Sequence, residues 1–302
     1  MLPGNLESHT KPFGRSENGS AKKPICIDLF CGLGGWSEGF LAEGYSCIGL
    51  DIERHDYGTG GYPGQLVLQD VLTLHGSQFK NATCIVASPP CQEYSYMAMP
   101  WTRAKKIAEE YRTGVRDVKK LTELFDACFR IQREAISATV KNCRNCDATG
   151  ITRGCCRCEV CDGRGVTKRY IPMVVENVRG ARPWVGRSAW NFGSFHLWGD
   201  VPALMPLSYG TKLPKAINES IRQGRSPARW TNPAEHYFGK KQGGNWGHDP
   251  DSLTRRFYSS DPSRKAASAQ IAKIPFPLSH HIARCFKEDA WNPDAQCASG
   301  CS

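Results

Sequence analysis

Four short apolar runs stand out along the chain: 25-ICIDLF-30, 47-CIGLDI-52, 83-TCIVA-87 and 170-YIPMVVENV-178. Each run is nearly continuous rather than alternating, which is typical of strands buried on both faces of a parallel sheet. Two intervening segments have apolar residues at helical spacing, weakly at 36–44 and more strongly at 121–140. This alternation of strands and helices predicts a doubly wound α/β domain.

Two segments interrupt the alternation. Residues 141–169 are cysteine-rich and basic, and residues 200–262 are rich in Gly, Pro, Asn, Trp and Arg without a clear period. Apolar patterning resumes in 271-IAKIPFPLSHHIARCF-286, where we expect another helix. The expected organisation is a main domain formed by 25–140, 170–199 and a return at 263–287, an insert at 141–169, a small irregular domain at 200–262, and loose tails at 1–24 and 288–302.

Composition narrows the possible classes of function. No apolar run approaches about 20 residues, so we expect no membrane span. The polar start lacks the apolar core of a signal peptide. A net charge of +10 favours a polyanionic partner such as nucleic acid. Fifteen cysteines without an export signal suit a reducing cytoplasm, where they serve packing, catalysis or metal binding.

A glycine-rich loop, 28-DLFCGLGGWSEGF-40, directly follows the first strand. Its glycines permit a tight turn, and the free N–H groups of the following helix can bind a polar or anionic group. Asp51 and Asp70 end the next two apolar stretches, and a carboxylate about 20 residues past such a loop commonly holds ribose hydroxyls. The pattern favours a ligand with ribose and adenine over a loop that serves geometry alone. There is no P-loop motif, which disfavours nucleoside triphosphate hydrolysis.

The stretch 88-SPPCQEYS-95 places a cysteine after two prolines at the end of a strand. Pro89 and Pro90 stiffen the turn and hold Cys91 at the carboxyl edge of the sheet, where open α/β folds bind ligands. Glu176 and Asn177 end the last strand and meet the same edge. A rigidly held thiol can attack one side of a heterocycle while a carboxyl group protonates the other. A packing cysteine and a solvated glutamate are the alternative interpretation.

In this order, the stretches resemble the cytosine-C5 DNA methyltransferase family. DLFCGLGGWSEGF is similar to the family's S-adenosylmethionine loop, SPPCQEYS to its nucleophile motif, and 174-VVENVRG-180 to its Glu-Asn-Val motif. The resemblance covers about 25–100 and 115–180 and, more weakly, 263–287, and 190-WNFGSFHLWGDVPALMP-206 resembles short phage and prophage members. It implies a Rossmann-like S-adenosylmethionine-dependent methyltransferase sheet, double-stranded DNA as substrate, and a cytoplasmic, DNA-associated protein in a bacterium or phage-infected cell. We expect a monomer.

The resemblance also implies roles for individual residues. Cys91 would attack C6 of a cytosine flipped out of the duplex, Glu176 would protonate N3, and C5 would then take the methyl group. Pro90 and Asn177 would shape this pocket. The implied cofactor-binding residues are Asp28, Phe30, Gly32, Leu33, Gly34, Gly35, Asp51, Ile52, Asp70, Val71 and Pro89.

Nucleic-acid contacts are implied in two further segments. Residues 94–112, which contain Arg103 and Lys105, would form a mobile loop that closes over DNA; a solvated basic helix is the alternative. Residues 200–262 would recognise the target sequence, with Arg222, Arg225 and Arg229 as candidate readers because arginine pairs well with guanine.

The chain departs from the family pattern in one motif. The Gln-x-Arg-x-Arg motif expected after Glu-Asn-Val is missing, and Arg182, Arg187 or an arginine of 222-RQGRSPAR-229 would have to replace its arginine. This absence favours one alternative function, a catalytically degenerate zinc-dependent DNA-binding protein. A second alternative, an RNA cytosine-C5 methyltransferase, stays open because no feature of the sequence decides between duplex DNA and structured RNA.

The cysteine-rich insert 141–169 replaces a link that usually has about 2–6 residues. Its elements CRNCDATG and CEVCDGRG resemble DnaJ-type zinc modules, and Cys143, Cys146, Cys158 and Cys161 form a CxxC…CxxC array that predicts structural Zn²⁺. Cys155 or Cys156 could replace one of these ligands. An insert this small needs metal to fold. Its basic residues could grip a DNA backbone, with a purely structural clip as the alternative.

Overall fold

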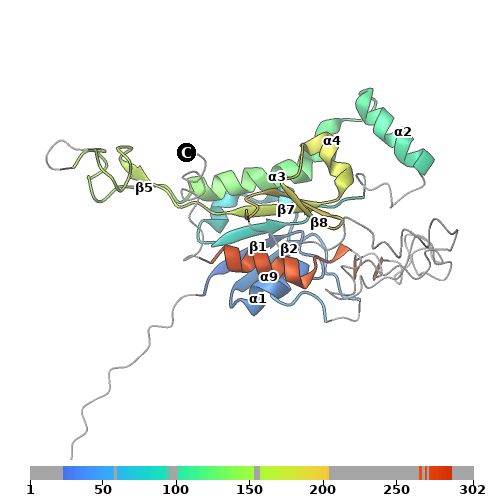
Figure 1. The fold of residues 1–302 in the computed structure, drawn as a ribbon, viewed down its shortest axis with the longest axis horizontal. Helices are drawn as coiled ribbons and strands as arrows, with labels where there is room; N and C mark the ends of the chain where they lie inside the picture. Colours follow the sequence, from blue (N-terminus) through green and yellow to red (C-terminus); the bar gives the residue numbers. More distant parts are fainter. Residues whose placement is uncertain are drawn as a thin grey trace, which may run out of the picture.

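The computed structural model describes residues 23–57, 60–92, 94, 101–152, 157–203, 265–266, 269–270 and 272–287. Its main body is a seven-stranded sheet with helices on both faces (Figure 1). The strand order is β3-β2-β1-β4-β7-β9-β8. This mixed, mostly parallel sheet confirms the predicted α/β class and fits a Rossmann-like methyltransferase fold.

The four apolar runs form the centre of the sheet. They fold as β1 (Ile25–Leu29), β2 (Ser46–Asp51), β4 (Cys84–Ala87) and β7 (Met173–Asn177), which pair in parallel. Every residue of β4 and β7 is buried, as expected for strands covered on both faces. The sheet is extended by β3 (Gln65–Leu68), parallel to β2, and by the antiparallel hairpin β8 (Trp190–Phe192) and β9 (Phe195–Gly199).

One face of the sheet is covered by α3 (Val118–Ser137). Asp117 caps this helix by accepting a hydrogen bond from the backbone N–H of Lys119 at 2.9 Å. The face predicted from the apolar spacing is the buried one, and it includes Phe125, Cys128 and Ile131. These side chains pack with the α3-facing residues of β1, β4 and β7 in one hydrophobic core.

The other face is covered by α1 (Gly35–Ala42) and α9 (Phe276–Cys285), which confirms both helices predicted there. The two helices approach closely, because a Cβ placed on Gly39 would lie 2.3 Å from the backbone N of His280. Tyr45 donates a hydrogen bond from its hydroxyl to the carbonyl of Ala283 at 3.0 Å. The distant C-terminal segment thus completes the core beneath the glycine-rich loop.

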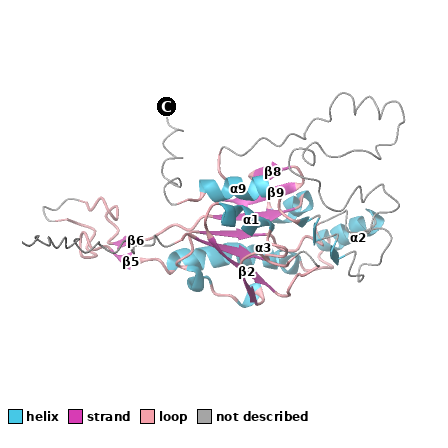
Figure 2. Cartoon of the chain, turned by 90° about the horizontal axis from the view of Figure 1, so that it is seen from below, coloured by secondary structure: helices cyan, strands magenta, loops and turns pink. Residues whose placement is uncertain are grey.

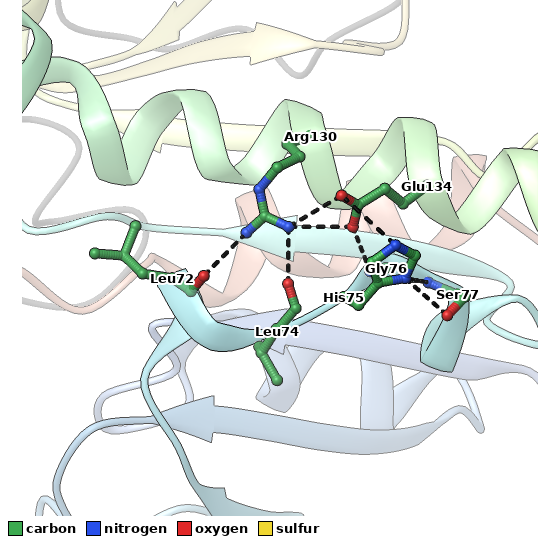
Figure 3. Close-up of polar contacts among 7 residues, drawn as sticks. All are labelled: Leu72, Leu74, His75, Gly76, Ser77, Arg130 and Glu134. Carbon is green, nitrogen blue, oxygen red and sulfur yellow. Dashed lines mark hydrogen bonds and ion pairs between the residues drawn. The ribbon is translucent and has the colours of Figure 1, made fainter.

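Two short 3₁₀ turns, η1 (Val71–Thr73) and η2 (Gly76–Phe79), carry the chain from β3 to β4 and are fastened to α3 (Figure 3). Arg130 donates hydrogen bonds to the carbonyls of Leu74 at 2.8 Å and Leu72 at 3.4 Å. Glu134 pairs with Arg130 and accepts the backbone N–H of Gly76 at 2.6 Å. This contact lowers the pKa of the Glu134 carboxyl, with Arg130 and His75 adding to the effect.

The two edges of the sheet carry different segments. At the carboxyl edge lie the loop after β4, the short η3 (Arg179–Ala181) and α4 (Arg182–Val185), and α2 (Trp101–Arg112), which lies close to α4. The cysteine-rich insert, with β5 (Lys141–Asn142) and β6 (Val166–Thr167), lies beyond the opposite, amino edge (Figures 1 and 2). Among the described residues, no helix combines the length and apolarity that crossing a membrane would require.

Candidate functional site

The loop that carries Cys91 is held from several directions. Ser88 accepts a hydrogen bond from the indole N–H of Trp36 at 3.0 Å, which ties the start of the loop to α1. Tyr94 donates its backbone N–H to the carbonyl of Cys91 at 3.0 Å and its hydroxyl to the carbonyl of Leu121 at 2.5 Å. The loop is therefore fixed to helices on both faces of the sheet, while Cys91 itself stays half-buried.

Glu176 and Asn177 lie at the same edge, as the parallel strand order predicts. Both are buried at the end of β7, with Glu176 8% exposed. Asn177 donates from Nδ2 to the carbonyl of Pro89 at 3.0 Å and accepts the N–H of Val178 at 2.8 Å. The asparagine therefore joins the two motifs directly and orients the end of β7 towards the Cys91 loop.

Gly180 allows this close packing of the two motifs. A Cβ added at this position would lie 1.8 Å from the carbonyl oxygen of Tyr94, far inside van der Waals contact. Only glycine lets the segment after β7 press against the loop after β4. The glycine of VVENVRG thus has a packing reason that the sequence did not reveal.

The Cys91 thiol is shifted towards its neutral form. Burial and then the negative charge of Glu176 raise its pKa to about 11. Burial is the larger cause, and the charge of Glu176 at the end of β7 adds to it. Such a pair holds a negative charge on one member more easily than on both.

The glycine-rich loop between β1 and α1 has an unusual backbone. Phe30, Gly32 and Gly34 have φ values of 58°, 48° and 75°, and Phe30 is a rare non-glycine residue in this region. A Cβ on Gly34 would also lie 2.3 Å from the ring of Pro63. Strain of this kind gathers at ligand sites, and here it turns the chain sharply from the strand into the N-terminus of α1.

The two acidic residues predicted at strand ends, Asp51 and Asp70, lie at the same edge. Both accept hydrogen bonds from backbone N–H groups. Asp51 accepts the N–H of Gly32 at 2.9 Å and the N–H of Ile52 at 2.8 Å, which ties β2 to the glycine-rich loop. Asp70 caps η1 by accepting the N–H of Leu72 at 2.9 Å. Carboxylate oxygens have further lone pairs, so both groups can still accept a ligand hydroxyl or amine. Beside them the Ile52 side chain is 74% exposed, and Val71 is buried.

Asp28 is buried at the start of the loop, with one oxygen that has no hydrogen-bond partner. Its Oδ2 accepts the hydroxyl of Ser37 at 2.7 Å, while Oδ1 has none. Ser37 in turn lies 2.5 Å from the hydroxyl of Tyr62. Burial raises the pKa of Asp28 well above its ordinary value. Sequence reasoning missed Ser37 and Tyr62, because only the fold brings the loop before β3 over the start of α1.

Residues 101–112 of the predicted loop 94–112 form the helix α2, and closure of this segment over DNA stays a prediction. Ile107 and Tyr111 are buried, and Tyr111 packs edge-on against Trp184 of α4 with ring centroids 5.6 Å apart. Arg103 and Lys105 lie on the exposed side. The basic stretch is therefore an amphipathic helix that contacts α4 through Tyr111, which matches the alternative weighed for it.

One buried group near the site was not expected. His196 of β9 lies directly opposite Asn177 and shares a hydrogen bond between Nδ1 and the Ser188 hydroxyl at 2.9 Å. Burial and the nearby Arg182 and Arg179 lower the pKa of this histidine. The Nε of Arg182 is buried without a hydrogen-bond partner. Arg187, the other nearby substitute considered for the missing arginine, is exposed.

The four cysteines predicted as metal ligands come together in the insert. Their sulfurs lie within 4.8 Å of one another, with Cys143 and Cys158 3.8 Å apart and Cys146 and Cys161 3.6 Å apart. The set could hold one metal ion. Two N–H groups donate hydrogen bonds to these sulfurs. The backbone N–H of Gly150 donates to Cys146 at 3.2 Å, and the side-chain amide of Asn145 donates to Cys158 at 3.3 Å. Such bonds stabilise thiolates.

The insert contains two similar halves, residues 143–150 and 158–165, whose corresponding positions are fifteen residues apart. Cys143 donates its N–H to the carbonyl of Gly165, and Cys158 donates to Gly150, both at 2.9 Å. Ala148 and Gly163 each close a turn by donating to the carbonyl of the first cysteine of their half, both at 3.0 Å. Tight turns with positive φ at these two positions explain the repeated sequence.

Several predicted residues lie outside the described part of the chain. They are Cys155, Cys156, the candidate base readers Arg222, Arg225 and Arg229, and most of the predicted target-recognition region.

Comparison with known proteins supports the resemblance seen in the motifs. Residues 25–121 match the model of the family "C-5 cytosine-specific DNA methylase", which is less than half of the chain. The match runs from β1 to the first turn of α3 and so includes the glycine-rich loop and Cys91, but not Glu176. It supports a methyltransferase that acts on cytosine.

No curated protein matches the chain. Among solved structures, the Entamoeba histolytica methyltransferase EhMeth is similar at 10% identity and a TM-score of 0.40, over 90% of this chain and 100% of that chain.

Proposed function

We propose that this chain is a DNA (cytosine-5) methyltransferase, which transfers a methyl group from S-adenosylmethionine to C5 of a cytosine flipped out of the duplex. The observation that carries the proposal is the junction of two motifs at one sheet edge, where Asn177 bonds to Pro89 and the charge of Glu176 acts on Cys91. A nucleophile beside an acid suits addition to one side of a pyrimidine and protonation of the other.

The residues around the glycine-rich loop fit S-adenosylmethionine. When bound, this cofactor supplies an electrophilic methyl group. The orphan Oδ1 of Asp28 is a buried acceptor that suits a cationic or N–H-bearing group, and exposed Ile52 offers an apolar surface for a flat base. The proposed binding residues are those implied by the resemblance: Asp28, Phe30, Gly32, Leu33, Gly34, Gly35, Asp51, Ile52, Asp70, Val71 and Pro89.

Cys91 and Glu176 would carry out the proton and electron movements on the base. When the Cys91 sulfur adds to C6, the ring's extra electron pair spreads over C5 and N3. A proton from Glu176 to N3 neutralises that charge and leaves C5 as an enamine-like nucleophile towards the methyl group. Transfer of the C5 proton to a water molecule then forms the C5–C6 double bond and expels Cys91 as thiolate, while N3 returns its proton to Glu176. Pro90 and Asn177 would fix the geometry of this pair.

The high pKa of Cys91 fits this scheme if the pair shares one proton. In the free protein the proton lies mainly on sulfur, because burial and Glu176 both oppose the thiolate. The reactive form has the proton on Glu176 and the charge on sulfur. A base whose N3 accepts a hydrogen bond from protonated Glu176 stabilises this form, so substrate binding would activate the nucleophile.

The four-cysteine cluster would hold a structural Zn²⁺. Four thiolates in two matching turns suit tetrahedral zinc, and a unit with so few apolar residues needs such a ligand to fold. On the substrate side, Arg103 and Lys105 on the exposed face of α2 would contact phosphates near the flipped base.

Mass spectrometry of nucleosides tests the proposed reaction. DNA, and RNA in parallel, is incubated with the protein and S-adenosylmethionine and then digested. The proposal expects 5-methyldeoxycytidine from DNA, lost in Cys91→Ser but retained in Cys285→Ser, which changes another half-buried cysteine. A product from RNA only, or none from a folded protein that still binds DNA, would overturn it.

A further inference from the structure

The cysteine-rich insert is attached at the far end of the molecule from the catalytic groups. Tyr94, in the Cys91 loop, bonds to the carbonyl of Leu121 in the first turn of α3, and the insert begins after the last turn at Ser137. At 1.5 Å per residue, these sixteen residues separate the two ends by about 24 Å. Figures 1 and 2 both show the insert extending further away from α2.

The insert is closed at its base. Thr139 accepts the N–H of Arg169 at 2.9 Å and donates its hydroxyl to the Arg169 carbonyl at 3.0 Å, so the entering and leaving strands are bonded together. The Arg169 guanidinium donates to the carbonyls of Ala82, at 2.8 Å, and Lys80. The four-cysteine cluster is therefore carried on a closed stalk that is fastened to the amino edge of the sheet.

The surface of this unit carries cations that its own carboxylates do not neutralise. Lys141, Arg144, Arg164 and Lys168 are all exposed, and within the described residues none of them makes an ion pair. Arg164 also donates from Nε to the carbonyl of Cys161 at 3.1 Å. Arg157 pairs with Asp162 at 2.6 Å, which leaves Asp147 and Glu159 as the exposed carboxylates of the described insert without an ion pair. The excess positive charge is complementary to a phosphate backbone.

The same stretch of DNA does not reach both surfaces easily. The proposed function places the target duplex across the carboxyl edge, and the same duplex would have to bend along α3, over at least about 24 Å, to meet the insert. DNA has a persistence length of about 500 Å, so a bend on that scale is strongly unfavourable. A second stretch of nucleic acid meets the insert without such bending.

We infer that the insert is a second nucleic-acid-binding surface, which holds the phosphate backbone of another duplex segment through Lys141, Arg144, Arg164 and Lys168 while the carboxyl edge acts on its target. The inference rests on the proposed function for the identity of the first segment. In this inference the insert binds the second duplex segment and takes no part in the chemistry.

A two-duplex capture experiment tests the inference. A target duplex is immobilised and saturated with the full chain, and a labelled duplex without cytosine is then added over a series of salt concentrations. The wild-type protein is expected to capture the second duplex. A fourfold variant carries Lys141→Ala, Arg144→Ala, Arg164→Ala and Lys168→Ala. Its plot of log K against log salt is expected to be less steep by about 3.6, and it should lose most of the capture.

Two controls keep the result specific. Metal content and thermal unfolding of the fourfold variant show that the insert is still folded. Arg103→Ala with Lys105→Ala removes exposed cations from α2 instead, and should weaken target binding while leaving capture of the second duplex unchanged. Equal capture by the fourfold variant, or no capture by the wild type, would overturn the inference. The charged surface of the insert would then have another role, such as binding a protein partner.

Methyl transfer, measured in the same samples, separates this inference from the proposed function. Capture without methyl transfer would contradict the reaction alone. Methyl transfer that is unchanged in the fourfold variant, together with lost capture, is the expected result.

Discussion

Asn177 donates a hydrogen bond from its side-chain amide to the carbonyl of Pro89, 3.0 Å away, and so links the end of β7 to the loop that carries Cys91. The donor and acceptor are 88 residues apart in the chain. Asn177 is 1% exposed, so water cannot replace the bond.

Asn177→Ala should therefore impair turnover more than it impairs folding. It leaves a buried carbonyl and the N–H of Val178 without their partner, which costs about 1–3 kcal/mol of stability. A shift of about 1 Å in the Cys91 loop would lower kcat on the order of 100-fold. Thermal unfolding and single-turnover methyl transfer measure the two effects. The control Asn191→Ala removes a more exposed bond to Gly193 and should change neither strongly; equal losses in both variants would contradict a specific role.

The reactivity of Cys91 should report its coupling to Glu176. With a pKa of about 11, the rate of alkylation by iodoacetamide should rise about tenfold for each unit of pH up to that value. Glu176→Gln removes a negative charge that disfavours the thiolate, so the profile should move to lower pH. The same variant should lose methyl transfer, because the amide cannot protonate N3.

Peptide mass spectrometry identifies the modified residue in this experiment. Among the described free cysteines only Cys91 and Cys285 are half-buried, and the rest are buried. Cys285→Ser therefore serves as the background for the pH series. An unchanged Cys91 profile in Glu176→Gln would show that the two groups are not coupled.

The sequence predicted the central sheet and the meeting of its motifs, because both follow from local patterns. The continuous apolar runs identified β1, β2, β4 and β7, and the parallel order required Cys91 and Glu176 to share an edge. The stretch that ends at Asp70 likewise contains β3, whereas no pattern predicted the antiparallel hairpin of β8 and β9. Which of these residues bind cofactor or base stays a prediction, since their positions alone do not test their roles.

The features that sequence reasoning missed depend on contacts between distant segments. Tyr62 reaches Ser37, which in turn bonds to Asp28, only because the chain before β3 folds over α1. His196 meets Asn177 only through the antiparallel hairpin. The partner of Tyr111 in α2 is Trp184, 73 residues further along the chain, and only the fold brings these two rings together.

Glu134 should make stability depend on pH on the acidic side. Its folded-state pKa is lowered, first by the N–H of Gly76 and then by Arg130, so the carboxylate stabilises the fold above its unfolded pKa of about 4.3. That contribution is lost as pH falls through the folded pKa. Glu134→Gln should lower Tm at pH 7 and flatten its decline between pH 5 and pH 3. Glu123→Gln, at an exposed position of the same helix, should keep the wild-type profile; an equally flat profile there would exclude a specific effect of Glu134.

Removing metal should unfold the insert and leave the main sheet intact. The four buried cysteines form a small core that is separate from the cores of the main sheet. Thr139 and Arg169 close the stalk through hydrogen bonds that do not involve sulfur. Dialysis against a chelator, or Cys146→Ser, should therefore abolish bound zinc and raise hydrogen exchange at residues 143–165. The main thermal transition should move by only a few degrees, and methyl transfer to a single short duplex should persist. Cys128→Ser, which alters a buried cysteine in the core of α3, should show the opposite pattern, with metal retained and the main transition lowered. Collapse of the main transition on metal removal would show that the insert supports the catalytic sheet after all.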